Sequence, residues 1–499
     1  MDNPMISNDL QQRVGAFLKQ SHGLYIDGRW MPAQSGETFT TENPATGETI
    51  ARISAGAEAD IDLAVSAARK AFERGPWSSM PPAARARMIE KLADAIEAHA
   101  EDFALIESID NGMPFMSARM FNVGGAVGAL RYNAGWATRL GGETSSPSIP
   151  GEWHAYTLRE PLGVAGLIVA WNMPLAMAVS KLAAALAAGC TVVLKPAELT
   201  SLSMVRVLQL IDALGFPPGV VNLVTGTGAA GAALAAHPGV DKISFTGSTA
   251  VGKSIVTAAT GNLKRVTLEL GGKSPGFIFG DALLGPAIEA SARSIFSNAG
   301  QTCVAGSRLF VHTSVFDQVV EGIAERARQF KVGAGTTPGT EIGPLISRRQ
   351  RERVTGYIDS GREEGAEVIV GGAALDGDGY FIQPTVLTRT VPAMRVMREE
   401  IFGPVLCVVP FGDENDLDSL ADQGNDTPYG LSASIWTRDI SVAHRLARRL
   451  KAGTVRINTA VGMDSSMPFG GYKQSGWGRE NGRSGVEAYT EIKSVFVGL

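Results

Sequence analysis

The feature that most constrains the fold is a regular alternation of short apolar runs and helical segments between Gly163 and Gly272. Apolar runs predict buried strands over 163–169, 191–194, 220–224, 242–245 and 265–270. The segments between them include KLAAALAAG, SMVRVLQLIDALG and GAALAAHPG, which are typical of helices that end at glycine. Strand, helix and strand in repetition predict an α/β fold with a parallel sheet. Such sheets bind ligands at the carboxyl ends of their strands.

Segments on both sides of this stretch add further elements. Upstream, 81–111 has apolar residues at helical spacing and predicts an amphipathic helical region. Downstream, a helix is expected over 282–297, and strands and helices follow from Arg308 to about Asn458. The stretch 141–161 is rich in Gly, Ser and Pro before it turns extended. A chain of 499 residues exceeds one ordinary core, so we expect two or three domains around a central cleft.

Composition and charge exclude several classes of function. Apolar residues make up 44% of the chain and charged residues 19%, which indicates a soluble, well-packed protein. The net charge of -5 and the lack of a basic stripe argue against nucleic acid as a partner. No apolar run is long enough to span a bilayer, and the N-terminus does not resemble a secretory signal, so we expect a cytoplasmic protein without membrane association. The histidines lie in no metal-binding motif, and no bound metal is expected.

Cys303 is the candidate nucleophile among three scattered cysteines, which suit a reducing compartment better than a disulfide framework. It lies in FSNAGQTCVAGS, a turn of small residues before an expected strand at 308–311, where a substrate can reach a thiol. The alternative is a buried, inert cysteine. We interpret Cys190, at a helix-to-strand junction, and Cys407, in the apolar run PVLCVVPF, in that inert way.

Two further candidates stand at strand ends. Glu269 lies in RVTLELGGKSPG, where partial desolvation would raise its pKa toward the range of a general base. An ion pair with a nearby lysine such as Lys273 is an equally open interpretation. Asn172 in IVAWNMP directly follows a buried strand and could donate a hydrogen bond to an oxyanion. Taken alone, it is more simply an ordinary loop residue.

Two glycine-rich turns compete as a phosphate site. GTGAAG, at 226–231, has the spacing of a dinucleotide fingerprint, but no acidic residue stands clearly at the expected distance. FTGSTAVG, at 245–252, offers backbone N–H groups and the Ser248 hydroxyl at the start of a helix. Both also fit ordinary strand-to-helix turns. Lys195 and Glu198, in LKPAE at another strand end, could bind ribose hydroxyls or form a solvated pair.

In this order, the motifs resemble those of the aldehyde dehydrogenase superfamily. They are IVAWNMP, LKPAE, FTGSTAVG, LELGGKSP, GQTCVAGSR, EEIFGPV and PFGGYKQSGWGRENG, and the similarity runs from about Gly28 to the C-terminus. It implies a Rossmann-like NAD-binding domain with a parallel sheet, over 1–140 and 162–271. A second α/β domain with the catalytic cysteine would follow over 272–475. A small β arm, over 141–161 and 486–499, implies a homodimer or homotetramer.

The resemblance also implies a chemistry. Cys303 attacks the aldehyde, Asn172 and the Cys303 backbone N–H hold the oxyanion, NAD takes the hydride, and Glu269 activates the water that hydrolyses the thioester to the carboxylic acid. Lys181 and Glu480 would continue a proton path from Glu269. The resemblance favours 245–252 as the phosphate-binding turn. The implied NAD contacts are Val169, Trp171, Lys195, Glu198, Gly228, Phe245, Ser248, Gly271, Glu400 and Phe402. A carboxylate at Glu198 would repel a 2′-phosphate, which favours NAD over NADP.

The expected substrate tunnel favours an apolar aldehyde. It would be lined by Met173, Met177, Thr302, Val304 and the loop 461–467, with no arginine pair or acidic cluster. A weaker similarity to bacterial phenylacetaldehyde-type dehydrogenases suggests a medium-sized or aromatic substrate, and an aliphatic or terpenoid aldehyde stays open. One alternative function is a CoA-acylating dehydrogenase, whose members generally lack the base at Glu269. Another is a non-catalytic structural protein that retains the fold.

Overall fold

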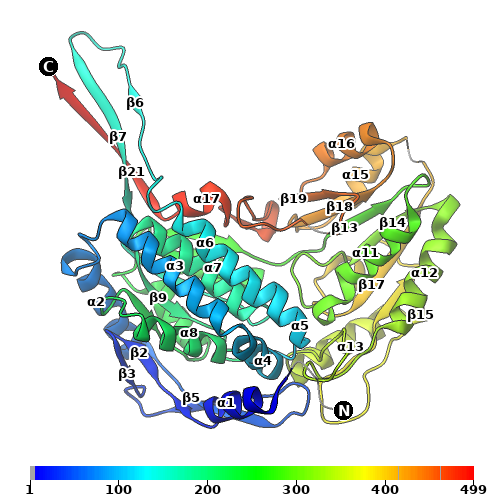
Figure 1. Cartoon of the computed structure of the whole chain (residues 1–499). Helices are drawn as coiled ribbons and strands as arrows, with labels where there is room; N and C mark the ends of the chain where they lie inside the picture. Colours follow the sequence, from blue (N-terminus) through cyan, green and yellow to red (C-terminus); the bar gives the residue numbers. More distant parts are fainter. Residues whose placement is uncertain (1–5, 414, 461) are drawn as a thin grey trace.

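Two large sheets, each covered by helices, lie in the left and right halves of the molecule, and a narrow arm extends from one end (Figure 1). The computed structural model describes residues 6–413, 415–460 and 462–499. The fold is therefore mixed α/β with parallel sheets, which confirms the predicted class.

The first sheet has the strand order β20-β12-β11-β8-β9-β10-β2-β3, and its central strands are parallel. Strands β2 and β20 pair antiparallel at its two sides. The expected strands form within one or two residues of the predicted bounds. The strands are β2 (Leu24–Ile26), β3 (Arg29–Met31), β8 (Val164–Ile168), β9 (Thr191–Lys195), β10 (Val221–Leu223), β11 (Lys242–Thr246), β12 (Arg265–Glu269) and β20 (Gly476–Trp477).

Helices bury both faces of this sheet, which is why its central strands carry buried apolar residues on both faces. Val192 and Leu194 of β9 belong to the core on one face, whereas Val193 between them belongs to the core on the other. The expected helical region over 81–111 divides at His99 into α3 and α4. The surrounding helices are α2 (Glu58–Arg74), α3 (Pro82–Ala98), α4 (Ala100–Asp110), α6 (Gly124–Ala134), α7 (Pro174–Ala188), α8 (Leu202–Ala213), α9 (Gly228–Ala236) and α10 (Thr249–Ala259).

The second sheet has the order β15-β16-β17-β14-β13-β18-β19 and is parallel except for β15. Cys407 lies buried inside β17, in the strand that PVLCVVPF predicts. The strands are β13 (Pro275–Ile278), β14 (Arg308–His312), β15 (Glu367–Val370), β16 (Thr385–Thr388), β17 (Val405–Phe411), β18 (Ser432–Trp436) and β19 (Thr454–Ile457). The helices packed on this sheet include α11 (Leu284–Phe296), α12 (Phe316–Gln329), α13 (Arg348–Glu363), α15 (Leu417–Asn425) and α16 (Ile440–Arg449).

The arm is a narrow antiparallel sheet of β6 (Thr144–Ser145), β7 (Trp153–Pro161) and β21 (Thr490–Gly498). Strands β7 and β21 pair along their whole length, so the chain end returns beside a segment more than 300 residues earlier. The short helix α17 (Gly482–Glu487) leads into β21. Within the described residues, no helix is long and apolar enough to cross a membrane. The cytoplasmic location stays a prediction.

Candidate active site

The carboxyl ends of the parallel strands of the first sheet open into a cleft of about 450 Å³. Asn172 follows β8, Glu198 follows β9, Ser248 follows β11 and Gly271 follows β12. Cys303 contributes from the second sheet's side, in the turn between α11 and β14. Of the site residues predicted from sequence, the cleft is lined by Trp171, Asn172, Glu198, Ser248, Gly271, Cys303, Glu400 and Phe402.

A tightly anchored turn places Cys303. The short turn over Ser297–Gly300 holds Asn298 and Ala299 in left-handed backbone conformations, with φ of 51° and 53°. Non-glycine residues adopt this conformation only where their surroundings enforce it. Gln301 supplies the anchor, because its Oε1 accepts from the Ile346 N–H at 2.9 Å and its Nε2 donates to the Asn298 carbonyl at 3.1 Å. The position of the thiol is therefore fixed by the fold.

Asn172 is hydrogen-bonded to the same turn. Its Nδ2 donates to the Gln301 carbonyl at 2.9 Å, and the Asn298 amide donates back to the Asn172 carbonyl at 3.0 Å. An amide nitrogen carries two hydrogens, and only one is used in this contact. The second can donate to an oxygen that develops charge beside Cys303.

The surroundings of Cys303 favour its thiol over the thiolate. Burial raises its pKa to about 12, and the nearby carboxylates of Glu400 and Glu269 raise it as well. A nucleophilic thiolate then needs a base or a positive charge supplied at the site. Burial also raises the pKa of Cys190, to about 11, and that of Cys407. Both of these lie fully buried in the cores, as their inert interpretation requires.

Glu269 is an isolated buried carboxyl group. Its side chain is 3% exposed, and neither carboxylate oxygen has a hydrogen-bond partner among the described residues. Burial raises its pKa well above 4.5, repulsion from Glu480 adds to this, and Lys181 and Arg479 oppose it. The buried ammonium of Lys273 also lacks a partner within the described chain, so the ion pair between Glu269 and Lys273 is wrong. A carboxyl with a raised pKa and free oxygens suits general-base chemistry.

Two glycines let three functional segments meet. The Gly272 N–H donates to the Glu400 carboxylate at 2.8 Å. A Cβ at Gly271 would lie 2.5 Å from Glu400 Oε2, and one at Gly272 would lie 2.2 Å from the Cys303 carbonyl oxygen. Any side chain would force these groups apart. The sequence LELGG therefore brings the end of β12 into contact with both Glu400 and the cysteine turn.

The remaining predicted cofactor residues surround the cleft in different ways. Lys195 Nζ lies 3.2 Å from Glu198 Oε2, and burial lowers the pKa of this lysine. The rings of Trp171 and Phe402 meet edge to face, with centroids 5.3 Å apart. Val169 and Phe245 are buried at strand ends and do not line the cleft.

Of the two glycine-rich turns, the one at 245–252 lines the cleft with Thr246, Gly247 and Ser248. The hydroxyl of Ser248 caps α10. Gly228 begins α9 behind a Thr227 cap and is not part of the described lining.

Sequence reasoning missed the residues that α13 adds to the cleft, which include Arg349, Gln350 and Arg353. Gln350 Nε2 donates to the Phe402 carbonyl and Arg353 Nη2 to the Glu400 carbonyl, both at 2.8 Å. Their segment, RRQRERV, has the composition of a solvent-exposed helix face, and no nearby residue in the sequence indicates a contact with the first sheet.

The expected substrate-side residues lie on exposed or half-exposed surfaces. Met173 and Met177 lie half-buried at the start of α7, and Thr302 and Val304 flank Cys303. Met467 is 64% exposed in the loop that follows β19. Position 461, predicted as part of this loop, lies outside the described residues. Across the described parts of the chain, no group of His, Cys, Asp or Glu side chains could hold a metal ion.

Comparisons with known proteins agree over nearly the whole chain. The sequence model of the aldehyde dehydrogenase family matches residues 30–495. The chain is 47% identical over 495 residues to the putative aldehyde dehydrogenase DhaS of Bacillus subtilis, covering 99% of both proteins. It is 45% identical over 477 residues to aldehyde dehydrogenase 1A1 of Oryctolagus cuniculus, covering 95% of both.

Solved structures show the same agreement. A structure of an aldehyde dehydrogenase from Bacillus cereus, in complex with NAD+, has a TM-score of 0.95 at 47% identity and covers 98% of both chains. A betaine aldehyde dehydrogenase from Staphylococcus aureus, also in complex with NAD+, has a TM-score of 0.95 at 38% identity, with 98% of this chain and 97% of the other covered.

Proposed function

The chain belongs to the aldehyde dehydrogenase family, and on that premise we propose that it oxidises an apolar aldehyde to the carboxylic acid with NAD, through a thioester on Cys303. The observation that carries the proposal is the contact between the β12 end and the cysteine turn. It joins a nucleophile, an amide donor and an unpaired buried carboxyl group around one cleft. These are the three groups that capture and hydrolysis of an acyl group require.

Capture of the aldehyde begins at Cys303. The thiol of Cys303 gives up its proton to water in the cleft that it lines, and the sulfur attacks the carbonyl carbon. The carbonyl oxygen becomes an oxyanion held by the free N–H of Asn172 and the backbone N–H of Cys303. Glu198, Ser248 and Glu400 would hold NAD, which would supply the hydride acceptor for this oxidation. The acyl group then stays on the Cys303 sulfur as a thioester. Because the turn is anchored by Gln301, these donors are positioned before the substrate arrives.

Hydrolysis of the thioester needs a base, and this is the role of Glu269. It removes a proton from water as the water oxygen attacks the thioester carbon, and the Cys303 sulfur leaves. The raised pKa of Glu269 lies closer to neutral pH than that of an ordinary glutamate, and a general base is most effective when its pKa is near the working pH. Lys181 and Glu480 carry the proton away from it. A retained base also argues against the CoA-acylating alternative.

The cleft fits a dinucleotide. Its volume of about 450 Å³, the start of α10 for a phosphate and the carboxylates of Glu198 and Glu400 for ribose hydroxyls are the features that such a cofactor needs. Lys195, Trp171 and Phe402 complete the binding residues, with Val169, Phe245, Gly228 and Gly271 shaping the strand and helix ends. Glu198 favours NAD over NADP by charge repulsion.

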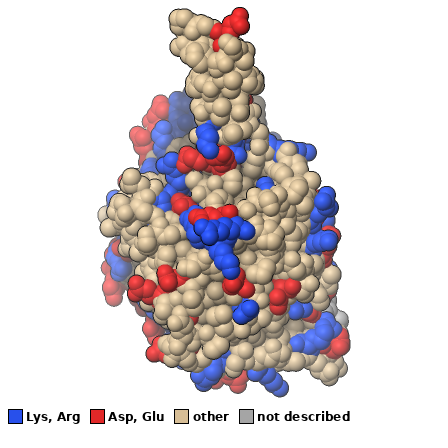
Figure 2. All heavy atoms as spheres, turned by 90° about the vertical axis from the view of Figure 1, so that its left-hand side faces the viewer, with Lys and Arg blue, Asp and Glu red and all other residues tan. Residues whose placement is uncertain are grey.

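Half-buried and exposed apolar side chains support two further proposals, one for the class of aldehyde and one for the assembly of subunits. Met173, Thr302 and Val304 lie next to Asn172 or Cys303 in the chain, and Met177 lies one turn of helix beyond Met173. Their half-buried side chains would offer an adaptable apolar surface to a medium-sized or aromatic aldehyde. The arm supports a homodimer or homotetramer, since it carries few charges in the view of Figure 2. Its exposed apolar side chains are Ile149, Trp153, Leu158, Ile492, Phe496, Val497 and Leu499. Such a patch on a projecting sheet is typical of a subunit contact.

The test of this function is NADH formation with a panel of apolar, aromatic and charged aldehydes, first with NAD and then with NADP, without CoA. We expect turnover with apolar or aromatic aldehydes and NAD. Turnover that depends on added CoA would identify the acylating alternative instead. Folded, reduced protein that forms no NADH with any aldehyde and binds no NAD would support the non-catalytic alternative.

A further inference from the structure

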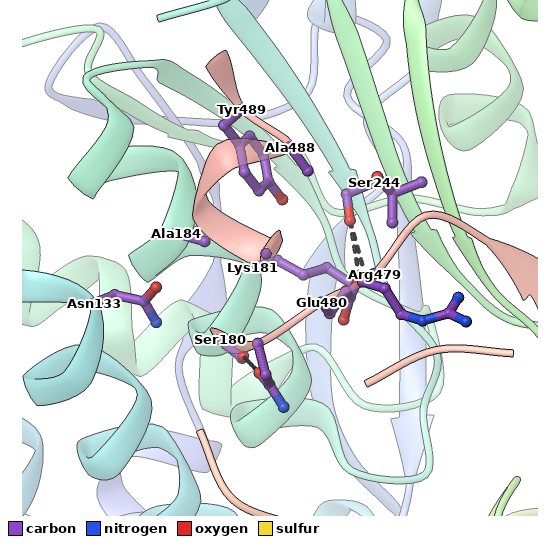
Figure 3. Close-up of a pocket in the computed structure, with 12 residues that line it drawn as sticks. Asn133, Ser180, Lys181, Ala184, Ser244, Arg479, Glu480, Ala488 and Tyr489 are labelled. Atoms are coloured by element: carbon purple, nitrogen blue, oxygen red, sulfur yellow. Dashed lines mark hydrogen bonds and ion pairs between the residues drawn. The ribbon is translucent and has the colours of Figure 1, made fainter. Parts of the chain in front are cut away.

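A second, much smaller chamber lies close to Glu269 and shares no lining residue with the cofactor cleft. Its volume of about 10 Å³ leaves room for roughly one water molecule. It lies where α6, α7, β11, β12 and the segment before β21 converge (Figure 3). Its polar lining consists of Asn133, Ser180, Lys181, Ser244, Thr267, Arg479, Glu480, Asn481 and Tyr489.

Ser244 is the centre of a buried triangle of polar groups in this chamber. Lys181 Nζ donates to Ser244 Oγ at 3.0 Å, and Ser244 Oγ donates to Glu480 Oε1 at 3.0 Å. Lys181 also forms an ion pair with the same oxygen of Glu480. The serine is 1% exposed and the lysine 2%. Ser244 and Lys181 are therefore shielded from bulk water, whereas the Glu480 side chain is 18% exposed.

The triangle is tied to the proposed base through the backbone. The Phe469 N–H donates to the Glu480 carbonyl at 2.7 Å, and the Glu480 N–H donates to the Phe469 carbonyl at 2.8 Å. The next residue, Gly470, passes so close to Glu269 that a Cβ there would lie 2.9 Å from its Oε1. The charges of Glu480 and Lys181 both shift the pKa of Glu269. The charges of the triangle therefore act directly on the ionisation of Glu269, the proposed base.

A serine hydroxyl suits the centre of this triangle because it accepts and donates at the same time. It accepts from an ammonium, which can only donate, and donates to a carboxylate, which can only accept. An alanine here would remove one acceptor from Lys181 and one donor from Glu480. The ion pair would remain, but its two side chains would be free to turn.

We propose that Ser244 is a positioning residue for the departure of the proton from Glu269. The inference rests on the proposed function, in which Glu269 takes a proton from the attacking water. As Lys181 accepts that proton, it passes one of its own to Glu480, so the lysine keeps its charge and Glu269 becomes ionised again. The Glu480 side chain is 18% exposed, so it then releases the proton to solvent water. Ser244 holds Lys181 and Glu480 in the geometry that this transfer needs.

The experiment measures two quantities for Ser244→Ala, with an aldehyde and NAD in steady state. One is kcat, and the other is the fraction of Cys303 present as thioester, from rapid acid quench and intact mass. Loss of one hydrogen-bonded position predicts a fall in kcat of about 3- to 10-fold. The thioester fraction should rise above that of the wild type, because only hydrolysis is slowed. Ser244→Thr keeps the hydroxyl and should restore both values.

Thr267→Ser is the matched control, because it keeps the hydroxyl that accepts from Lys242 and removes only a methyl group. Thr267 is a buried hydroxyl that lines the same chamber, but its Oγ1 accepts from Lys242 Nζ at 2.7 Å and does not contact the triangle. Its kcat and thioester fraction should stay within about twofold of the wild type.

A fall in kcat without thioester accumulation, or an equal effect in Thr267→Ser, would show that Ser244 serves packing alone and would overturn the proposal. Unchanged kcat in Ser244→Ala would overturn it too. A wild-type protein that forms neither NADH nor thioester would refute the proposed function itself.

Discussion

Replacement of Glu269 by glutamine separates the two halves of the proposed reaction. Glutamine has nearly the same shape, and neither carboxylate oxygen makes a hydrogen bond within the described chain, so no structural contact is lost. The substitution removes a base and a negative charge. The charge of Glu269 raises the pKa of Cys303, and its removal therefore lowers that pKa. Capture of the aldehyde should not be slowed.

The expected loss of rate in Glu269→Gln follows from the role of Glu269 as a general base. A positioned general base contributes about 10²- to 10⁴-fold to a rate, which corresponds to about 3–5 kcal/mol of activation free energy. Glu269 is 3% exposed, so bulk water cannot replace it as the proton acceptor. We therefore expect the steady-state rate of Glu269→Gln to fall by about 10²- to 10⁴-fold, while the first turnover stays near the wild-type rate.

Stopped-flow absorbance of NADH measures both phases in one experiment. The variant should give a burst of about one NADH per active site and then stall, with Cys303 held as the thioester. In the wild type, steady-state turnover should increase with pH as Glu269 ionises through its raised pKa, and the variant should lose this dependence. Glu321→Gln is a suitable control, because this exposed glutamate pairs with Arg328 on the surface of α12, away from the cleft.

Two results would refute this reasoning. Steady turnover of Glu269→Gln near the wild-type rate would show that another group activates the water. Loss of the burst together with steady turnover would show that Glu269 acts in capture, as the base that deprotonates the Cys303 thiol.

Three further substitutions test other parts of the site and the fold. Cys303→Ala should abolish NADH formation and leave the Kd for NAD, measured by calorimetry, within about twofold; a large loss of affinity would contradict the assignment of the cysteine to chemistry alone. Glu198→Gln should raise the ratio of kcat/KM for NADP to that for NAD by on the order of tenfold, because the repulsion of a 2′-phosphate is removed; an unchanged ratio would exclude Glu198 as the determinant. Glu107 is buried, with burial raising its pKa to about 8, so its ionisation destabilises the fold as pH rises from about 4.5 through 8. Glu107→Gln should therefore raise Tm relative to the wild type more at pH 9 than at pH 5, and an equal change at both would show that Glu107 does not titrate in the folded protein.

The sheet that positions the cleft was predictable because its signals are local. Apolar runs bounded by glycine set strands β8 to β12, and each lies within one or two residues of its expected bounds. Parallel strands then place their carboxyl ends at one edge, which puts Asn172, Glu198 and Gly271 around one site without further information. The motifs beside these strands added the family and its chemistry. In these respects the sequence alone determined the class of fold and most residues of the candidate site.

Only the tertiary structure decided which side chains find partners. The sequence left open whether Glu269 pairs with Lys273, although these residues are four positions apart; in the fold both are buried, and neither has a hydrogen-bond partner among the described residues. Lys181, Ser244 and Glu480 come together from segments up to 299 residues apart. Arg349 and Arg353 of α13 line the cleft, although they lie far along the chain from the strands whose ends form it. Hydrophobic periodicity and secondary-structure propensity depend on residues that are close together in the sequence. The burial, pKa and hydrogen bonds of a side chain depend instead on distant segments that only packing brings into contact.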